Sequence, residues 1–370
     1  MAKIDTTFAN VIKKYGAKDF DACFNCGNCT AVCGLTDKNA NFPRIFIRYG
    51  MLGQKEEILN SKELWLCYAC GECSLNCPRQ AAPGDYMAAL RRYSIASYEP
   101  TGLTKLIFKS NLFSIFITLF FAIILGFFLL TLKPDIIVSR WIFELLPYEI
   151  IHNMGLAIFA ITGFSVAWGM ITMFLKLSKN NVKNDKNKIS FLKSISKVAA
   201  EMGKMKRYKS CDNEEESYWN KKSEIVKPWF VHWAIMWGFI GLLLATILDF
   251  IFKNPETSIW LPSRILGTIA GFFLIYGTTL AIIYRFKKVT RSYSETKFAD
   301  WMFLFFLWIA GITGFWLEIS VGFEANNILS HLVFLVHTIV SMELVLLFAF
   351  SKFAHAFYRP IALMVYFMKL

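Results

Sequence analysis

The sequence predicts an all-α membrane protein, with a helical head over residues 1–100 and a six-helix transmembrane bundle over residues 101–370. Two observations lead to this fold class. The chain is 55% hydrophobic and 16% aromatic, which is too apolar for a soluble protein of 370 residues, and its apolar residues form long blocks after about residue 100. Eight of its nine cysteines, in contrast, lie before residue 78.

The cysteines of the head form two runs with the same spacing, C-x2-C-x2-C-x3-C, and Pro78 follows the second run. The first run is Cys23, Cys26, Cys29 and Cys33, and the second is Cys67, Cys70, Cys73 and Cys77. This spacing is typical of [4Fe-4S] ligands, so the doubled run predicts a two-cluster ferredoxin-like domain. In such ferredoxins the fourth cysteine of each run binds the other cluster. We therefore assign one cluster to Cys23, Cys26, Cys29 and Cys77, and the other to Cys67, Cys70, Cys73 and Cys33.

A zinc site and a disulfide framework are the alternatives, and both fit the cysteines less well. Structural zinc uses four ligands in two separated pairs, whereas here four cysteines crowd into eleven residues twice. Disulfides need an oxidising compartment, and the first residues show no apolar leader and no twin arginine.

The rest of the head has helical periodicity. Apolar residues at Phe8, Val11 and Ile12 predict a short first helix. The segment 43–65 between the cysteine runs starts at a proline suited to a first turn and predicts two helices rather than a hairpin. A further helix over residues 85–98 leads toward the membrane.

Six apolar blocks are long enough to cross the roughly 30 Å hydrocarbon core of a membrane. They cover residues 110–132, 150–175, 228–248, 265–284, 301–317 and 325–351. Only Glu343 interrupts the last block.

The loops between these blocks differ in basic residues. Lys and Arg number 13 in 179–227 and 5 in 285–297, against 2 in 133–149, 2 in 252–264 and none in 319–327. The positive-inside rule therefore predicts a multi-pass protein of the cytoplasmic membrane, with the head, the 179–227 loop and the C-terminus in the cytoplasm. Because the basic residues lie in loops, the net charge of +13 reflects topology and indicates no nucleic-acid partner.

All five histidines lie in or beside the predicted spans, where ionisable residues usually have a function. His337 and His355 are 18 residues apart, which is five turns of one continuous helix, so they are expected on one face roughly 27 Å apart. They could each hold a haem. The two axial ligands of one haem must lie at the same depth in the membrane. His232 is expected at the depth of His355, near the cytoplasmic side, and His152 at the depth of His337, near the outer side.

The segment from His337 to His355 resembles the last haem-binding helix of the respiratory nitrate reductase gamma subunit family. In that family the helix corresponding to the third span supplies both partner histidines, about ten residues apart. Here His232 matches the first, whereas Leu242 stands near the second, so His152 takes the second role.

The cysteine-rich head, with Cys-Phe-Asn-Cys-Gly-Asn-Cys and Leu-Trp-Leu-Cys-Tyr-Ala-Cys-Gly-Glu-Cys, is similar to the C subunit of heterodisulfide reductase. Fused to a haem b domain, it resembles the family of the C subunit of the quinone-interacting membrane-bound oxidoreductase complex. This resemblance implies cytoplasmic flavin-containing and iron-sulfur partner subunits and, beyond them, adenylylsulfate reductase in sulfate respiration.

The sequence thus predicts a quinone-linked oxidoreductase subunit that moves electrons between membrane quinone or menaquinone and cytoplasmic partners, through two haems b and two [4Fe-4S] clusters. No dinucleotide fingerprint, P-loop or nucleophile elbow is present, so other chemistry belongs to other subunits. His331 and Glu343 are the candidate quinone-site residues, at outer depth and deeper in the last span respectively. Two alternatives stay open: a heterodisulfide-reductase-like complex that uses another lipid-soluble carrier, and a membrane anchor that senses redox state.

Overall fold

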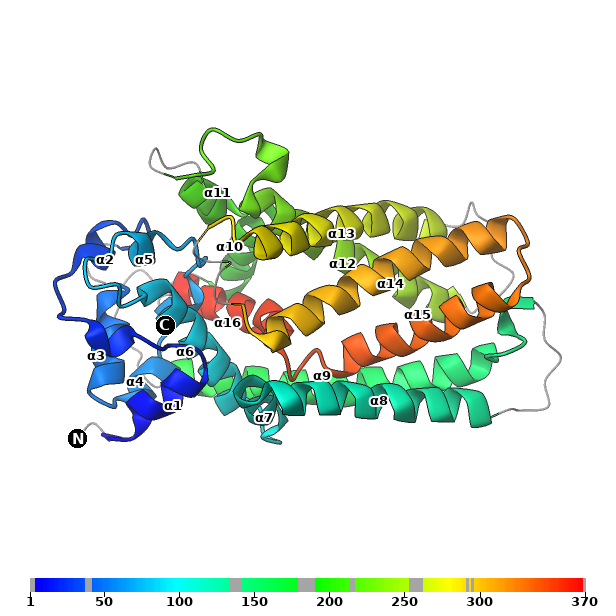
Figure 1. Cartoon of the computed structure of the whole chain (residues 1–370), viewed down its shortest axis with the longest axis horizontal. Helices are drawn as coiled ribbons and strands as arrows, with labels where there is room; N and C mark the ends of the chain where they lie inside the picture. The colour runs from blue at the N-terminus through cyan, green and yellow to red at the C-terminus, as the bar shows by residue number, and fades with distance from the viewer. Residues whose placement is uncertain are drawn as a thin grey trace.

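The computed structural model describes residues 4–36, 42–132, 141–178, 190–212, 217–252, 262–290, 293 and 296–368. These residues are largely helical and include no β-strand. Figure 1 shows a head of short helices at one end and long helices extending away from it. The predicted all-α class is therefore confirmed.

Short helices with apolar faces build the head. They are α1 (Phe8–Lys14), α2 (Asn28–Ala31), α3 (Arg44–Met51), α4 (Lys55–Leu59), α5 (Glu72–Leu75) and the longer α6 (Pro83–Tyr98). On α1 the buried residues are Phe8 and Ile12, one turn apart, as the periodicity predicts. Between the cysteine runs lie two helices, α3 and α4, followed by the 3-10 turn η2 (Glu63–Trp65).

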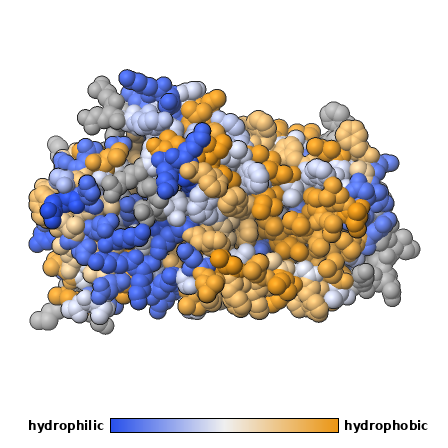
Figure 2. Space-filling view, in the orientation of Figure 1, coloured by the Kyte–Doolittle hydropathy of each residue, from blue (hydrophilic) through white to orange (hydrophobic). Residues whose placement is uncertain are grey.

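Within the described part of the chain, six helices are long and apolar enough to cross a membrane. They are α8 (Asn111–Thr131), α9 (Tyr148–Ser178), α12 (Pro228–Phe252), α13 (Pro262–Lys287), α14 (Phe298–Gly322) and α15 (Ile328–Leu346), and the short α7 (Leu103–Lys109) joins the head to α8. Large apolar side chains such as Leu112, Ile123 and Phe164 are exposed on them. Figure 2 shows this apolar surface over the long helices and a hydrophilic surface over the head, as expected for a bundle in lipid.

Glycines set the closest helix contact of the bundle, between α12 and α13. A Cβ added to Gly238 would lie 2.6 Å from the backbone nitrogen of Leu274, and one added to Gly277 would lie 2.8 Å from the carbonyl oxygen of Val231. Only glycine lets the two backbones approach this closely.

The last predicted span, 325–351, is too long at its C-terminal end, where residues 347–351 are not part of the helix. Helix α15 ends at Leu346, and His355 begins a separate helix, α16 (His355–Met368). Between them Ser351 is extended, and its hydroxyl accepts a hydrogen bond from the Phe353 nitrogen at 3.3 Å, which starts the 3-10 turn η6 (Lys352–Ala354). His337 and His355 therefore do not share one continuous helix face.

Helix α16 packs between the head and the bundle, against η2 of the head and α9 of the bundle. Its Tyr358 is buried, with its ring centroid 5.6 Å from that of Trp65 and 5.5 Å from that of Tyr98. The hydroxyl of Tyr358 also occupies the space of a side chain at Gly169 on α9. Buried residues of head and bundle thus form one continuous apolar core.

The 179–227 loop is partly helical. It contains α10 (Phe191–Lys204), α11 (Lys206–Asp212) and the 3-10 turn η4 (Glu224–Val226), whereas 179–189 and 213–216 lie outside the described residues. α10 packs on α16, and Figure 1 shows α10 and α11 at the head end of the bundle. Part of this loop therefore packs against the fold, whereas its polar composition alone suggests a surface for solvent or partners.

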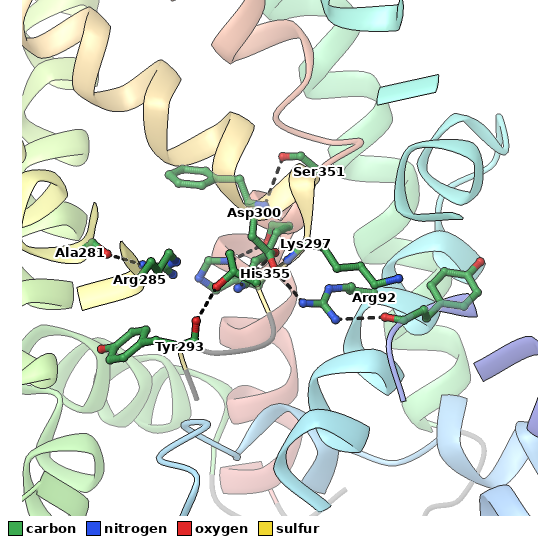
Figure 3. A network of polar contacts seen from close by, with 12 residues as sticks. Arg92, Ala281, Arg285, Tyr293, Lys297, Asp300, Ser351 and His355 are labelled. Carbon is green, nitrogen blue, oxygen red and sulfur yellow. Dashed lines mark hydrogen bonds and ion pairs between the residues drawn. The ribbon is translucent and has the colours of Figure 1, made fainter. Parts of the chain in front are cut away.

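A buried ion pair joins the head to the bundle at the start of α14. Arg92 of α6 donates to the Asp300 carboxylate at 2.7 Å and to the Tyr15 carbonyl at 3.0 Å, and Lys352 lies 3.3 Å from the other Asp300 oxygen. Asp300 also accepts from the Lys297 nitrogen at 3.3 Å, which caps α14. Figure 3 shows Arg92 directed at Asp300, close to His355.

We expect Asp300→Asn to destabilise the protein by about 3–5 kcal/mol, because it leaves the buried Arg92 charge without its carboxylate. The midpoint of thermal unfolding measures this loss. Asp21→Asn is the matched control, since the Asp21–Lys13 pair is on the surface and such pairs contribute about 0–1 kcal/mol. Equal midpoints for the two variants would contradict a structural role for Asp300.

Candidate redox centres

The two cysteine runs have the same local backbone. In each, the residue before the second cysteine is left-handed (Asn25, φ 64°; Ala69, φ 58°), and so is the glycine after it (Gly27, φ 90°; Gly71, φ 93°). The Asn25 nitrogen donates to Cys23 Sγ at 3.3 Å, and the Ala69 nitrogen donates to Cys67 Sγ at 3.4 Å. These turns present successive thiols to a common centre and supply N–H donors to sulfur, a contact that tunes iron-sulfur clusters.

The thiols gather in two sets that cross between the runs. Burial raises the pKa of Cys29, with smaller contributions from Cys23, Cys26 and Cys77. Burial likewise raises the pKa of Cys33 to about 11, with smaller contributions from Cys67 and Cys70.

Cys73 belongs with the second set, since burial and then Cys67, Cys70 and Cys33 raise its pKa. Cys29 of the other set makes a further, smaller contribution to the raised pKa of Cys73. The grouping is consistent with the interleaved assignment, which stays a prediction. Such high thiol pKa values mean that the thiolates need a cation, which cluster iron supplies.

The spacing of these thiols does not resemble a single-ion site. Among the described residues, no group of three or more His, Cys, Asp or Glu converges on one metal ion. A cubane cluster holds its four thiolates farther apart than a zinc ion does, because each thiolate binds a different iron atom. The donor set therefore fits a [4Fe-4S] cluster at each position.

His232 and His355 face each other at the head end of the bundle. Their ring centroids are 6.1 Å apart and their planes are 27° from parallel. An iron atom bound by two imidazole nitrogens at about 2 Å each would separate the centroids by about 6 Å. His355 Nδ1 lies 2.7 Å from the Lys352 carbonyl oxygen, so Nε2 is the nitrogen available to iron. The pair fits the axial ligands of a haem.

His337 lies on the wall of a separate cavity nearer the other end of the bundle. Its Nδ1 is 2.9 Å from Thr313 Oγ1, and Gly314 leaves room for the ring, since an added Cβ would lie 3.3 Å from His337 Cε1. The cavity measures about 450 Å³ and has Asp249 and Glu318 among its polar lining residues. His337 thus has an oriented ring with Nε2 available beside this cavity.

The second ligand of an outer haem stays a prediction. His152 follows Ile151, which lines the cavity, but His152 is not among the residues that line it. Its ring contacts Tyr148, with the centroids 5.8 Å apart.

The structure does not bring His331 and Glu343 together. They are twelve residues apart on α15, about 18 Å along the axis, and neither lines the cavity beside His337. His331 Nε2 is 3.1 Å from Asn326 Oδ1, and its ring packs on Trp141. Glu343 is buried. Two carboxylates near the ends of other spans, Asp249 and Glu318, lie at the cavity instead.

Sequence reasoning also missed residues around the second cysteine run. Arg91 Nη2 lies 3.6 Å from Cys67 Sγ, and its Nη1 donates to the Cys67 carbonyl at 3.2 Å. The ring of Tyr68, inside the Cys67–Cys70 loop, stacks on Tyr208 of α11. The position of Tyr68 between two ligands could have singled it out, whereas nothing in the local sequence marks Tyr208.

Comparison with known proteins supports the iron-sulfur assignment. Residues 19–81, which hold all eight cysteines of the two runs, match the family of 4Fe-4S dicluster domains. The head is therefore an iron-sulfur electron-transfer domain. No solved structure matches the chain.

Several curated proteins are similar to part of the chain. A protein of Archaeoglobus profundus that is described as like the C subunit of heterodisulfide reductase is 32% identical over 110 residues, 28% of this chain and 58% of the relative. The C subunit of the H(2):CoB-CoM heterodisulfide,ferredoxin reductase of Methanothermobacter thermautotrophicus is 34% identical over 88 residues, 24% of this chain and 48% of the relative. The chain spans about half the length of these relatives, and the likeness does not extend through the membrane bundle.

Proposed function

We propose that this chain is a membrane subunit that carries electrons between the quinone or menaquinone pool and cytoplasmic flavin-containing and iron-sulfur subunits. The observation that carries the proposal is the facing pair His232 and His355, whose 6.1 Å ring separation suits axial ligation of haem b, next to a two-cluster head. Haem b and the clusters would each supply one-electron chemistry.

The remaining parts of the chain are consistent with this route. His337 would hold the second haem, with His152 as its predicted partner. The cavity beside His337 would receive that haem, and the Asp249 and Glu318 carboxylates among its lining residues could accept protons from a quinol bound next to it, with Thr268 donating to Glu318 at 2.8 Å. The positive-inside rule places this end outside and the head in the cytoplasm.

The proposal of partner subunits rests on similarity to known proteins and not on contacts in the structure. Similarity to the C subunit of heterodisulfide reductase favours a complex with other redox subunits. That similarity also supports the second candidate, a heterodisulfide-reductase-like complex with another lipid-soluble carrier. Sulfate respiration with adenylylsulfate reductase as the final partner rests on the resemblance of the fused head and bundle to the quinone-interacting complex.

Visible spectroscopy of the purified protein tests the proposal. We expect b-type absorbance that a naphthoquinol reduces, with two haems per chain by pyridine haemochrome analysis. A redox-sensing anchor would instead hold clusters and no quinol-reducible haem. Absence of b-type absorbance from a preparation that retains eight cluster irons per chain would therefore refute the proposed function.

A further inference from the structure

Tyr68, inside the second cysteine run, packs against three helices next to the bundle, α10, α11 and α16. One face of its ring stacks on Tyr208, with centroids 5.2 Å apart and planes 26° from parallel. The Arg359 guanidinium carbon lies 3.8 Å from the Tyr68 centroid. The Tyr68 hydroxyl donates to Glu201 at 2.8 Å. Stacking, cation–π and hydrogen-bond contacts thus fix a ring that directly follows the ligand Cys67.

Both neighbours of Tyr68 lead to the facing histidines. The Tyr208 ring centroid is 6.0 Å from that of His232. Arg359 follows His355 by four residues on α16, about one helical turn. Packed rings therefore connect Tyr68, next to Cys67, through Tyr208 to His232, and Arg359 places the helix that carries His355 against the other side of the connection.

The first cysteine run has no such contacts with the bundle among the described residues. Its Cys26 is exposed, and the neighbouring Phe24 is 59% exposed. The second run, in contrast, contains two residues, Ala69 and Gly71, that line a small cavity together with Arg285 and Lys352 of the ion network. Figure 1 agrees, since α5 of the second run lies closer to the bundle than α2 of the first.

We infer that the second-run cluster, held by Cys67, Cys70, Cys73 and Cys33, is the one that exchanges electrons with the haem between His232 and His355. Tyr68 and Tyr208 form the packed connection. The first-run cluster then faces the partner subunits at the exposed side. This inference rests on the proposed function and adds the order of the centres and the residues between them.

Each transfer balances as one electron. A haem held by His232 and His355 and a cluster held by the second run would each supply one-electron chemistry, so that the electron lost by one centre would be the electron gained by the other. The tyrosine rings neither gain nor lose electrons or protons. Their role is positioning, because tunnelling falls off more slowly through packed atoms than across a gap.

Cluster deletion tests the order. Cys26→Ser and Cys70→Ser each remove one cluster, and spin quantification establishes that the other remains. The purified holoprotein is reduced, freed of excess reductant and mixed with a naphthoquinone carried in detergent micelles. Freeze-quench electron paramagnetic resonance (EPR) then follows the cluster, and absorbance follows the haem. We expect the cluster left in Cys26→Ser to be reoxidised with the haem, and the cluster left in Cys70→Ser to stay reduced after the haem is oxidised.

The connection is tested with all ligands intact. Tyr208→Leu removes the ring and is expected to slow cluster reoxidation with unchanged cofactor content and midpoint potentials, whereas Tyr208→Phe keeps the stack and the rate. The reverse pattern in the cysteine variants, or equal rates in the two Tyr208 variants, would overturn the inference. A protein without quinol-reducible haem would instead overturn the proposed function.

Discussion

His355→Ala and His232→Ala are each expected to remove the same haem, the one nearer the head, and to leave the second haem and both clusters in place. The two rings face each other at 6.1 Å and belong to different helices, α16 and α12. Loss of either axial nitrogen opens the coordination of the iron between them. Redox titration followed by visible absorbance should show the same component missing from both variants.

His331→Ala is the matched control for these variants. His331 is also a histidine beside a span, but its ring packs on Trp141 and it does not line the cavity beside His337. Both haems should persist in this variant. Loss of spectroscopically different haems from His355→Ala and His232→Ala would contradict the pairing of these two residues.

The proximity of His232 and His355 could be predicted from sequence, because each lies within five residues of a basic residue, Lys227 or Arg359, that marks the same face of the membrane. The six spans were predictable for a similar reason, since each is a long apolar block. The turn between α15 and α16 was not predictable in this way. Its residues Phe348, Ala349 and Phe350 are as apolar as a span, and α15 ends at Leu346, before them. Lys352, at the end of the turn, pairs with Asp300 of α14, a contact that the local sequence does not reveal.

In the candidate site, too, features set by neighbouring residues could be predicted, whereas contacts between distant residues could not. Ligand spacing within each cysteine run is local, so it could be recognised directly. The contacts of Tyr68 are with Tyr208 and Arg359, far away in the chain, and they depend on where α11 and α16 pack. Likewise, Glu343 is conspicuous in an apolar sequence, yet its position on α15 keeps it out of the cavity beside His337.

Cys77→Ser is expected to remove the first-run cluster, and Cys33→Ser the second-run cluster, each leaving the haem spectrum unchanged. Serine is close to cysteine in size but lacks the soft thiolate that iron-sulfur clusters require. The surroundings of the thiols are consistent with ligands exchanged between the runs. Cys77 contributes to the raised pKa of Cys29 in the first run, and Cys67 and Cys70 of the second run contribute to the raised pKa of Cys33.

Two reference variants, one from each run, identify which cluster is lost from Cys77→Ser and from Cys33→Ser. The EPR spectrum of reduced Cys77→Ser should match that of Cys26→Ser, and the spectrum of Cys33→Ser should match that of Cys70→Ser. Ligation within each run would give the opposite pairing, with Cys77→Ser matching Cys70→Ser. Because the head and the membrane histidines share no ligand, loss of haem from a folded Cys70→Ser or Cys77→Ser protein would show that cluster and haem binding are coupled through the core that head and bundle share.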